Sequence, residues 1–159
     1  MLVGIPGSGK SAVAALLARD RQVPLVDVDD LVEAELGAPA DEVFAGGESA
    51  YRTVEERLAL AALDGPGVVA LASGAVESAA VRDALAGLPV AWLRTSVQTA
   101  TRRLGMNALG MDALVAIRNR MDALLAERAP CYAAVATFAV DTDRLTAEQV
   151  AAAISETRS

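Results

Sequence analysis

Residues Gly4-Ile5-Pro6-Gly7-Ser8-Gly9-Lys10-Ser11 constrain the fold more than any other part of this 159-residue chain. They match the phosphate-binding loop pattern G-x-x-x-x-G-K-S/T at every fixed position, and such a loop joins a strand to a helix. Its glycines let the backbone curl so that successive N–H groups point at an anion. Lys10 is the only lysine in the sequence, and a compact ammonium there suits the β- and γ-phosphates of a nucleotide. The loop therefore predicts nucleotide chemistry.

The sequence on either side of the loop has the required character. Leu2 and Val3 are apolar, and residues 12–18 have the composition of a buried helix. Four further short apolar segments, each followed by a helical pattern, are predicted strands: residues 23–28, 67–72, 90–94 and 136–140. Apolar strands that alternate with helices predict an α/β fold in which helices cover both faces of a parallel sheet.

Length and composition fit one compact domain over residues 1–159, because 53% of the residues are hydrophobic and the chain is short for two cores. A net charge of −7 and an aromatic content of 3% argue against nucleic acid as a partner. Cys131 is the single cysteine, so no internal disulfide forms. The chain has no signal-peptide pattern and no apolar run of about 18 residues. We therefore expect a cytoplasmic protein that does not bind membranes.

Carboxylates follow the second predicted strand, at the edge of the sheet where α/β proteins bind ligands. Alternation along an extended chain would place Asp27 and Asp29 on the same side, facing the phosphate loop. Capping of a helix that starts near Leu31 is the other explanation for such residues. We assign that capping role to Asp30, and we favour a functional role for Asp27 and Asp29 because the loop lies nearby.

A predicted helix entry follows at residues 46–56. Glu48, Arg52, Glu55 and Glu56 recur there at three- and four-residue spacings. Taken alone, this spacing is typical of a salt-bridged helix surface in contact with solvent.

In combination, however, these motifs resemble those of the shikimate kinases, in the same order along almost the whole chain. The matching segments are residues 4–11, Asp27-Val28-Asp29, Gly47-Glu48-Ser49-Ala50-Tyr51-Arg52-Thr53-Val54-Glu55, residues 68–75, Arg102-Arg103, Arg128-Ala129-Pro130-Cys131-Tyr132 and residues 140–143. The resemblance implies a P-loop kinase fold with a five-stranded parallel sheet, a substrate-binding region at about residues 30–60 and a lid at about residues 104–112. It implies transfer of the γ-phosphoryl group of ATP to the 3-hydroxyl of shikimate, in aromatic amino acid biosynthesis, by a monomer.

The resemblance also implies a role for each matching residue at the nucleotide. Lys10 would neutralise the β- and γ-phosphates, while Ser11 and Asp27 would hold Mg²⁺ and its waters. The expected nucleotide-binding residues are Gly7, Ser8, Gly9, Lys10, Ser11, Ala12 and Arg103.

At the acceptor, the resemblance implies that Asp29 accepts or orients the substrate hydroxyl, so that Lys10 and Asp29 are the expected catalytic residues. Arg52 and Arg128 would clamp the substrate carboxylate, with Glu55 orienting Arg52. The expected substrate-binding residues are Asp29, Arg52, Ser73, Gly74 and Arg128.

Two positions depart from the family pattern. Ala72-Ser73-Gly74 stands where the family has three glycines, so two side chains occupy a place of close approach to the ligand. Gly110 falls near the lid's Arg-Pro-Leu, so the lid arginine is absent. An arginine supplied to a transferring phosphate is worth roughly 10³ to 10⁵ in rate. We still expect residues 104–112 to be a flap that closes over ATP.

Arg118 and Arg120 are candidates to replace that arginine. Their spacing within residues 114–125 is more typical of the solvated face of an amphipathic helix, which is the interpretation that we favour. A second hypothesis therefore stays open: a shikimate kinase-like protein that binds nucleotide but is catalytically weak, inactive or active on another substrate.

Overall fold

A computed structural model describes residues 1–37 and 47–157, and in this part of the chain five parallel strands form one sheet in the order β2-β3-β1-β4-β5. The strands are β1 (Leu2–Val3), β2 (Leu25–Asp27), β3 (Val68–Ala70), β4 (Ala91–Arg94) and β5 (Phe138–Asp141). They coincide with the five predicted segments apart from their ends, so the predicted α/β fold with a five-stranded parallel sheet is confirmed.

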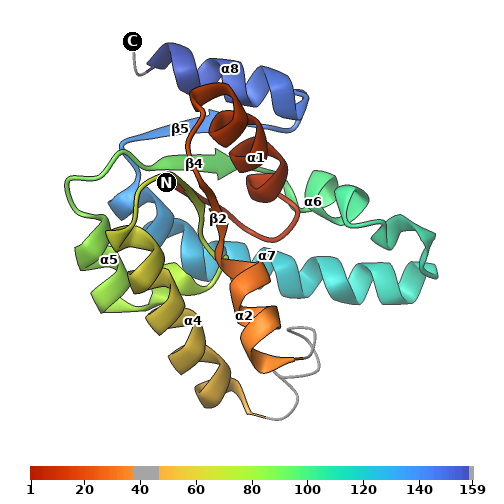
Figure 1. Cartoon of the computed structure of the whole chain (residues 1–159). Helices are drawn as coiled ribbons and strands as arrows, with labels where there is room; N and C mark the ends of the chain where they lie inside the picture. The colour runs from red at the N-terminus through yellow and green to blue at the C-terminus, as the bar shows by residue number, and fades with distance from the viewer. Residues whose placement is uncertain (38–46, 158–159) are drawn as a thin grey trace.

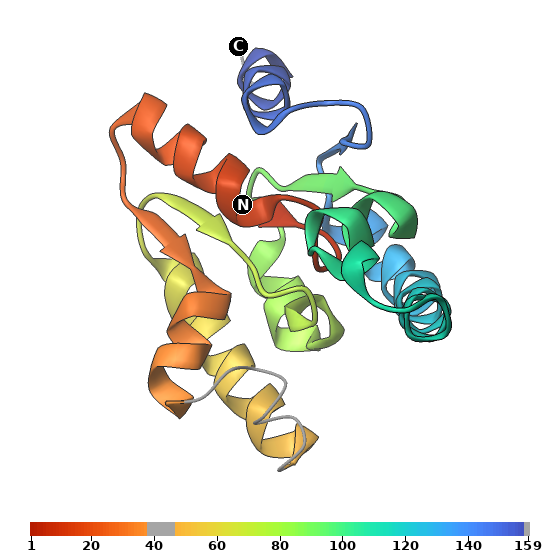
Figure 2. The ribbon, with the colours of Figure 1, turned by 90° about the vertical axis from the view of Figure 1, so that its right-hand side faces the viewer.

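Helices connect successive strands and cover both faces of the sheet (Figure 1). Their bounds are α1 (Lys10–Arg21), α2 (Val28–Leu36), α4 (Glu48–Asp64), α5 (Ala79–Leu85), α6 (Val97–Arg103), α7 (Met111–Val135) and α8 (Ala147–Thr157), with short 3₁₀ turns η1 (Ala75–Glu77) and η2 (Met106–Ala108). Figure 2 shows α1 and α8 on one side of the sheet and α4, α5 and α7 on the other.

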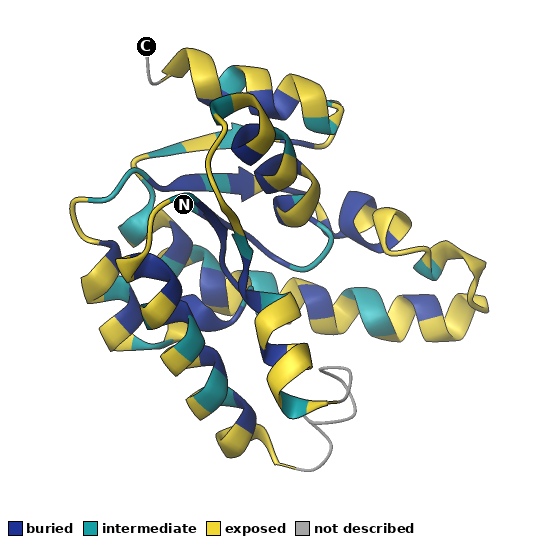
Figure 3. Ribbon diagram, viewed as in Figure 1, coloured by how far each residue is buried: buried dark blue, intermediate teal, exposed yellow. Residues whose placement is uncertain are grey.

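The core is divided by the sheet into two apolar clusters. Leu2, Val68 and Ala70 pack with α1 and α8, whereas Val3 and Val69 pack with the helices of the opposite face. This alternation follows from the two-residue period of a strand, and continuous apolar strands are required because both faces are covered. Figure 3 shows dark central strands, β1, β3 and β4, between helices that are exposed on their outer sides, while the edge strands β2 and β5 are partly exposed.

The prediction for the acidic residues after β2 was wrong in its geometry. The strand ends at Asp27 and α2 begins at Val28, so Asp29 lies in the first helical turn and not on an extended chain. Asp27 is the N-cap, because its Oδ1 accepts a hydrogen bond from the backbone N–H of Asp29 at 3.1 Å. Asp30 is exposed in that turn and does not have the capping role assigned to it. Asp27, the last residue of the strand, occupies the N-cap position and accepts from a helix N–H group there, so that Asp30 is left inside the first turn.

The region predicted to be a lid is a short connection beside the start of α7. Residues 104–110 link α6 to α7 through η2, and residues 111–112 already belong to α7. Figure 1 shows α6, η2 and the first turns of α7 projecting together from the body of the molecule. Movement of this segment on nucleotide binding stays a prediction. Of the predicted substrate-binding region, residues 38–46 lie outside the described residues.

Two glycines with positive φ differ in how closely other atoms approach them, so their replacement tests whether the close approach of Gly67 to Pro24 contributes to stability. Gly67 has a φ of +122°, and a Cβ there would lie 2.3 Å from the carbonyl oxygen of Pro24. That oxygen also accepts a hydrogen bond from the N–H of Val68 at 2.9 Å as β3 begins. Gly87 has a φ of +79°, and among the described atoms none lies within 4 Å of the position that a Cβ would take there.

We expect Gly67→Ala to lower the free energy of unfolding by about 2–5 kcal/mol, because backbone strain and the clash with Pro24 add together. Gly87→Ala should cost about 1–2 kcal/mol, because it meets the strain alone. Urea unfolding of the two variants measures the difference. Equal losses would show that the close approach at Pro24 does not constrain the sheet.

Candidate active site

The phosphate loop runs from β1 to α1, as its sequence predicts. Gly7 has a φ of +77°, and a Cβ there would lie 2.6 Å from the carbonyl oxygen of Ala100 in α6. Gly9 also has a positive φ, and it is the N-cap of α1. The N–H groups at the start of α1 therefore lie at the loop, where the positive end of the helix dipole favours an anion.

The loop forms one wall of a cavity of about 590 Å³, a size that suits a small-molecule ligand. All the predicted nucleotide-binding residues line it, and so does Asp29 of α2. The opposite wall comes from the segment that joins β5 to α8 and from α8 itself: Thr142, Leu145, Thr146, Ala147 and Val150. Of these five, the family resemblance implies a place near the adenine for Ala147 alone. The other four had no predicted site role, although they follow the carboxyl end of a strand and the position rule for α/β proteins points to them.

Lys10 is held inside the loop by main-chain oxygens. Its Nζ donates hydrogen bonds to the carbonyl oxygens of Gly4 at 2.9 Å and Ile5 at 3.1 Å. Burial lowers the pKa of Lys10 to about 8, while the negative charges of Asp29 and Asp27 oppose that shift. The ammonium is thus largely desolvated, and its attraction for an anion in the cavity is strengthened accordingly.

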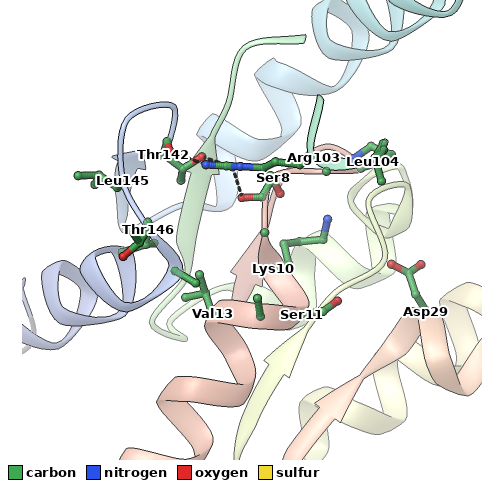
Figure 4. A pocket seen from close by; sticks show the side chains of 16 residues that line it. Ser8, Lys10, Ser11, Val13, Asp29, Arg103, Leu104, Thr142, Leu145 and Thr146 are labelled. Carbon is green, nitrogen blue, oxygen red and sulfur yellow. Dashed lines mark hydrogen bonds between the residues drawn. The ribbon is translucent and has the colours of Figure 1, made fainter. Parts of the chain in front are cut away.

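Asp29 faces Lys10 across the cavity (Figure 4). Burial raises the pKa of Asp29 to about 6, with Lys10 opposing the shift and Asp27 and Glu55 adding to it. A carboxyl group with a pKa near neutrality can take up a proton and release it again under working conditions. The structure therefore gives the predicted acceptor a suitable protonation equilibrium.

Of the two predicted metal ligands, Ser11 lines the cavity, whereas Asp27 is not among the lining residues and is the N-cap of α2. Both offer hard oxygen donors, and such donors fit Mg²⁺. Over residues 1–37 and 47–157, no group of three or more acidic, cysteine or histidine side chains could hold a metal ion alone. Magnesium commonly takes one or two protein ligands together with waters and the phosphates of its substrate. These residues therefore fit an ion that arrives with a nucleotide.

Arg103 joins the loop to the opposite wall of the cavity. Its Nη1 donates to the carbonyl oxygen of Ser8 at 3.3 Å and to Oγ1 of Thr142 at 3.0 Å, and its Nη2 donates to the carbonyl oxygen of Thr142 at 2.6 Å. Figure 4 shows this side chain spanning the two walls. Thr142 is itself buried and shares a 2.6 Å hydrogen bond with Thr95 at the end of β4.

Four of the five predicted substrate-binding residues form a second cluster. Gly74 lies against both arginines, since a Cβ there would be 1.8 Å from Nη1 of Arg52 and 3.1 Å from Nη2 of Arg128. Nη1 of Arg128 donates to Oγ of Ser73 at 3.4 Å. The fifth residue, Asp29, lines the nucleotide-side cavity instead.

Charged groups of the second cluster affect the pKa values of Lys10 and Asp29 in the nucleotide-side cavity. The charge of Arg128 adds to the lowering of the pKa of Lys10, after the larger effects of burial and of the two aspartates. In the same way, Glu55 contributes to the raised pKa of Asp29 after burial. Asp29 therefore interacts with charged groups of both clusters.

Glu55 makes the contact predicted for it. Its Oε1 accepts a hydrogen bond from Nη1 of Arg52 at 2.7 Å, and the Glu55 side chain is buried. Two further residues of this cluster had no predicted role. Tyr132 donates from its hydroxyl to the carbonyl oxygen of Ser73 at 2.7 Å, and Glu77 forms ion pairs with Arg128 and Arg52. Tyr132 could have been found from the sequence, because it follows Arg128 by one helical turn.

The solvated interpretation of the two arginines in α7 is confirmed for Arg120, which is exposed, and wrong for Arg118. Arg118 is half-buried, and it donates to Oγ1 of Thr101 and to Oδ1 of Asn107, each at 3.4 Å. The helix brings Arg118 against α6 and η2, a contact that helical periodicity alone does not reveal.

Among the described helices, none is both long and apolar enough to cross a membrane.

Replacement of Asp29 should make the protein more stable above neutral pH. Because the pKa of Asp29 is about 6 in the folded protein and 3.8 ordinarily, the folded state binds this proton more tightly than the unfolded chain does. The carboxyl group therefore destabilises the fold as pH rises from 3.8 to about 6, and the full cost persists above that range. We expect Asp29→Asn to raise the free energy of unfolding at neutral pH by about 1–3 kcal/mol.

Urea unfolding at pH values above and below this interval provides the measurement, with Asp30→Asn as the control because Asp30 is an exposed neighbour in the same helical turn. The gain should disappear below the ordinary pKa of 3.8. A gain of the same size at both pH values would contradict the assignment of the cost to the Asp29 charge.

Comparison with known proteins agrees with this arrangement. The shikimate kinase family model matches residues 6–158. The chain is 43% identical over 149 residues to the shikimate kinase of Mycobacterium avium (strain 104), covering 91% of this chain and 84% of the relative. It is 44% identical over 149 residues to that of Mycobacterium tuberculosis (strain CDC 1551 / Oshkosh), with the same two coverages of 91% and 84%.

Solved structures are similar over nearly the whole chain. The shikimate kinase from Acinetobacter baumannii in complex with shikimate has a TM-score of 0.83 and 26% identity, covering 99% of this chain and 90% of that one. The shikimate kinase from Bacteroides thetaiotaomicron shares the fold, with a TM-score of 0.83, 22% identity and coverages of 99% and 94%. Family model, relatives and fold agree with the site geometry, and the chain belongs to the shikimate kinase family.

Proposed function

We propose that this chain transfers the γ-phosphoryl group of ATP to the 3-hydroxyl of shikimate. The observation that carries the proposal is the position of Asp29, which faces Lys10 across the nucleotide-side cavity and interacts electrostatically with Glu55 of the arginine cluster. Transfer of a phosphoryl group to a hydroxylated acid requires a proton acceptor between the loop that binds the phosphates and the cluster that binds the carboxylate.

On the nucleotide side, the N–H groups of the loop and the start of α1 bind the phosphates, and Lys10 neutralises their charge. Arg103 and the wall formed by Thr142, Leu145 and Thr146 bound the cavity on the other side. Ser11 and Asp27 would hold Mg²⁺ together with the nucleotide, and the ion would supply further neutralisation of the phosphate charge.

On the acceptor side, Arg52 and Arg128 bind the carboxylate of the substrate, because planar guanidinium groups can each donate two hydrogen bonds to it. The acceptor oxygen then attacks the γ-phosphorus, and the bond from that phosphorus to the bridging oxygen of ADP breaks. Asp29 takes the proton of the hydroxyl group. The chain contains no histidine, so a carboxylate is the side chain available for this task.

We also infer that residues 1–159 act as one domain and as a monomer. Both helix layers pack on a single sheet, which supports one domain. The monomeric state is what the resemblance to the shikimate kinases implies.

ADP release by the purified protein with Mg²⁺, ATP and shikimate tests the proposed reaction. We expect release that depends on shikimate and that falls at least roughly 10²-fold in Lys10→Ala, because a preorganised charge at the transferring phosphate is lost. Omission of shikimate is the control for ATP hydrolysis. Release at the same rate without shikimate would refute the assigned acceptor.

Arg52→Ala should separate the two halves of the site. Loss of one guanidinium from the carboxylate clamp should raise the Kd for shikimate by roughly 10²-fold or more, since a charge-assisted bidentate contact is removed. The affinity for ATP should be unchanged, because Arg52 does not line the nucleotide-side cavity. Calorimetric titration with each ligand measures both effects. Normal shikimate binding would show that Arg52 is not part of the clamp.

The alternative, a nucleotide-binding protein with weak catalysis, is favoured by one observation at the lid. Gly110 stands near the expected lid arginine, and among the described residues the nearby Arg118 is already engaged with Thr101 and Asn107. A longer side chain would fit at Gly110, because its φ is −59° and no described atom lies within 4 Å of the position that a Cβ would take.

Gly110→Arg should raise kcat roughly tenfold or more if the missing lid charge limits turnover. Gly110→Gln is the matched control, since it adds a long side chain without charge. An equal gain in both variants would assign the effect to a stiffer lid. No gain from Gly110→Arg would remove the argument for a catalytically weak protein.

A further inference from the structure

Glu77 connects the two arginines of the substrate cluster. It is the last residue of η1, three positions after Gly74. One of its carboxylate oxygens, Oε1, pairs with Nε of Arg128, and the other, Oε2, lies 3.7 Å from Nη2 of Arg52. The protein's own carboxylate therefore bridges the guanidinium groups that the proposed function assigns to the carboxylate of the substrate.

The charges of this cluster are already offset before a ligand arrives. Arg52 and Arg128 face Glu55 and Glu77, and Glu48 lies 3.8 Å from Nε of Arg52 at the exposed edge. Burial acts to lower the pKa of Arg52. The hydrogen bond from Arg52 to Glu55 and the negative charges of Glu55, Glu77 and Glu48 act in the opposite direction and outweigh burial, so the pKa of Arg52 is raised. An incoming acid therefore meets a cluster without excess positive charge.

The members of the cluster differ in how easily they can move. The side chain of Arg128 is 5% exposed and that of Glu55 is 4% exposed, whereas the side chain of Glu77 is 33% exposed. Glu77 can turn toward water at small cost because a third of its side chain is already solvated. Arg128 cannot, and a buried guanidinium left without a partner would be strongly unfavourable.

From this asymmetry we propose that Glu77 is an internal counter-ion of the empty protein, which the carboxylate of the substrate displaces on binding. The exchange replaces one carboxylate by another, so Arg128 stays paired throughout. It also lowers the affinity for the acid, because the contacts formed by the substrate are partly offset by the contacts that Glu77 gives up. Glu77 thus tunes the affinity of the acceptor site for an acid, and this inference rests on the proposed function.

A positioning role for Glu77 makes the opposite prediction. If Glu77 served to orient the clamp, its removal would weaken substrate binding. Arg52 is already oriented by its 2.7 Å contact with Glu55, and Arg128 is buried in α7 beside Ser73. These contacts hold the guanidinium groups without Glu77, so competition is the role that the geometry leaves for it.

Glu77→Gln tests the inference with little change in shape. We expect the KM for shikimate to fall roughly three- to tenfold, with the change in KM and not in kcat, because the competing negative charge is removed. A second measurement does not depend on turnover: the rise in melting temperature on adding shikimate should be larger in the variant than in the unaltered protein.

Glu56→Gln is the matched control. Glu56 lines the same hollow as Arg52 and Glu77, from the exposed side of α4, and its replacement removes the same charge without removing the bridge. A similar fall in KM in both variants would show a general electrostatic effect and overturn the inference. An unchanged or higher KM in Glu77→Gln would overturn it as well.

The same measurements separate this inference from the proposed reaction. A larger shikimate-induced rise in melting temperature in Glu77→Gln, without phosphorylation by either protein, would support the displacement of Glu77 and refute the kinase assignment. If shikimate shifts the melting temperature of neither protein, both are refuted.

Discussion

The site depends on the close approach of the phosphate loop to α6. At Gly7 the loop lies so near the carbonyl group of Ala100 that a Cβ would be 2.6 Å from its oxygen. This approach brings the end of α6 beside the loop, and from there Arg103 contacts both Ser8 and Thr142. Segments from β1, α6 and β5 are thereby fixed around one cavity, although they are far apart in the sequence. A glycine without a side chain is what makes this assembly possible.

A comparable arrangement organises the acceptor side around the turn before η1. Arg128 and Tyr132 are one helical turn apart in α7, and both donate hydrogen bonds to Ser73, at its side chain and its main chain respectively. Gly74 then allows Arg52 of α4 to approach the same turn. The serine that departs from the family's glycine pattern is therefore part of the contact with Arg128. Its hydroxyl accepts one of the hydrogen bonds that Arg128 can donate.

Sequence patterns predicted the parts of this structure that depend on local chemistry. The phosphate loop and the five strands follow from short motifs and periodicity, and the contact of Glu55 with Arg52 follows from the family resemblance. The patterns failed where the end of a strand decides the geometry, because Asp27 caps α2 and turns Asp29 into a helical residue. They also could not reveal the bridge made by Glu77, since pairing with α7 depends on how η1 and α7 pack in three dimensions.

The balance of charges explains why the two sides of the site bind anions by different means. On the nucleotide side Lys10 lies near Asp27 and Asp29, so the phosphates meet carboxylates as well as an ammonium. In the proposed function, a magnesium ion that arrives with the nucleotide would bring positive charge there. The acceptor brings no cation with it. Its carboxylate enters a cluster whose charges are already offset, and Glu77, which pairs with both arginines and is 33% exposed, is the internal carboxylate that we propose it displaces.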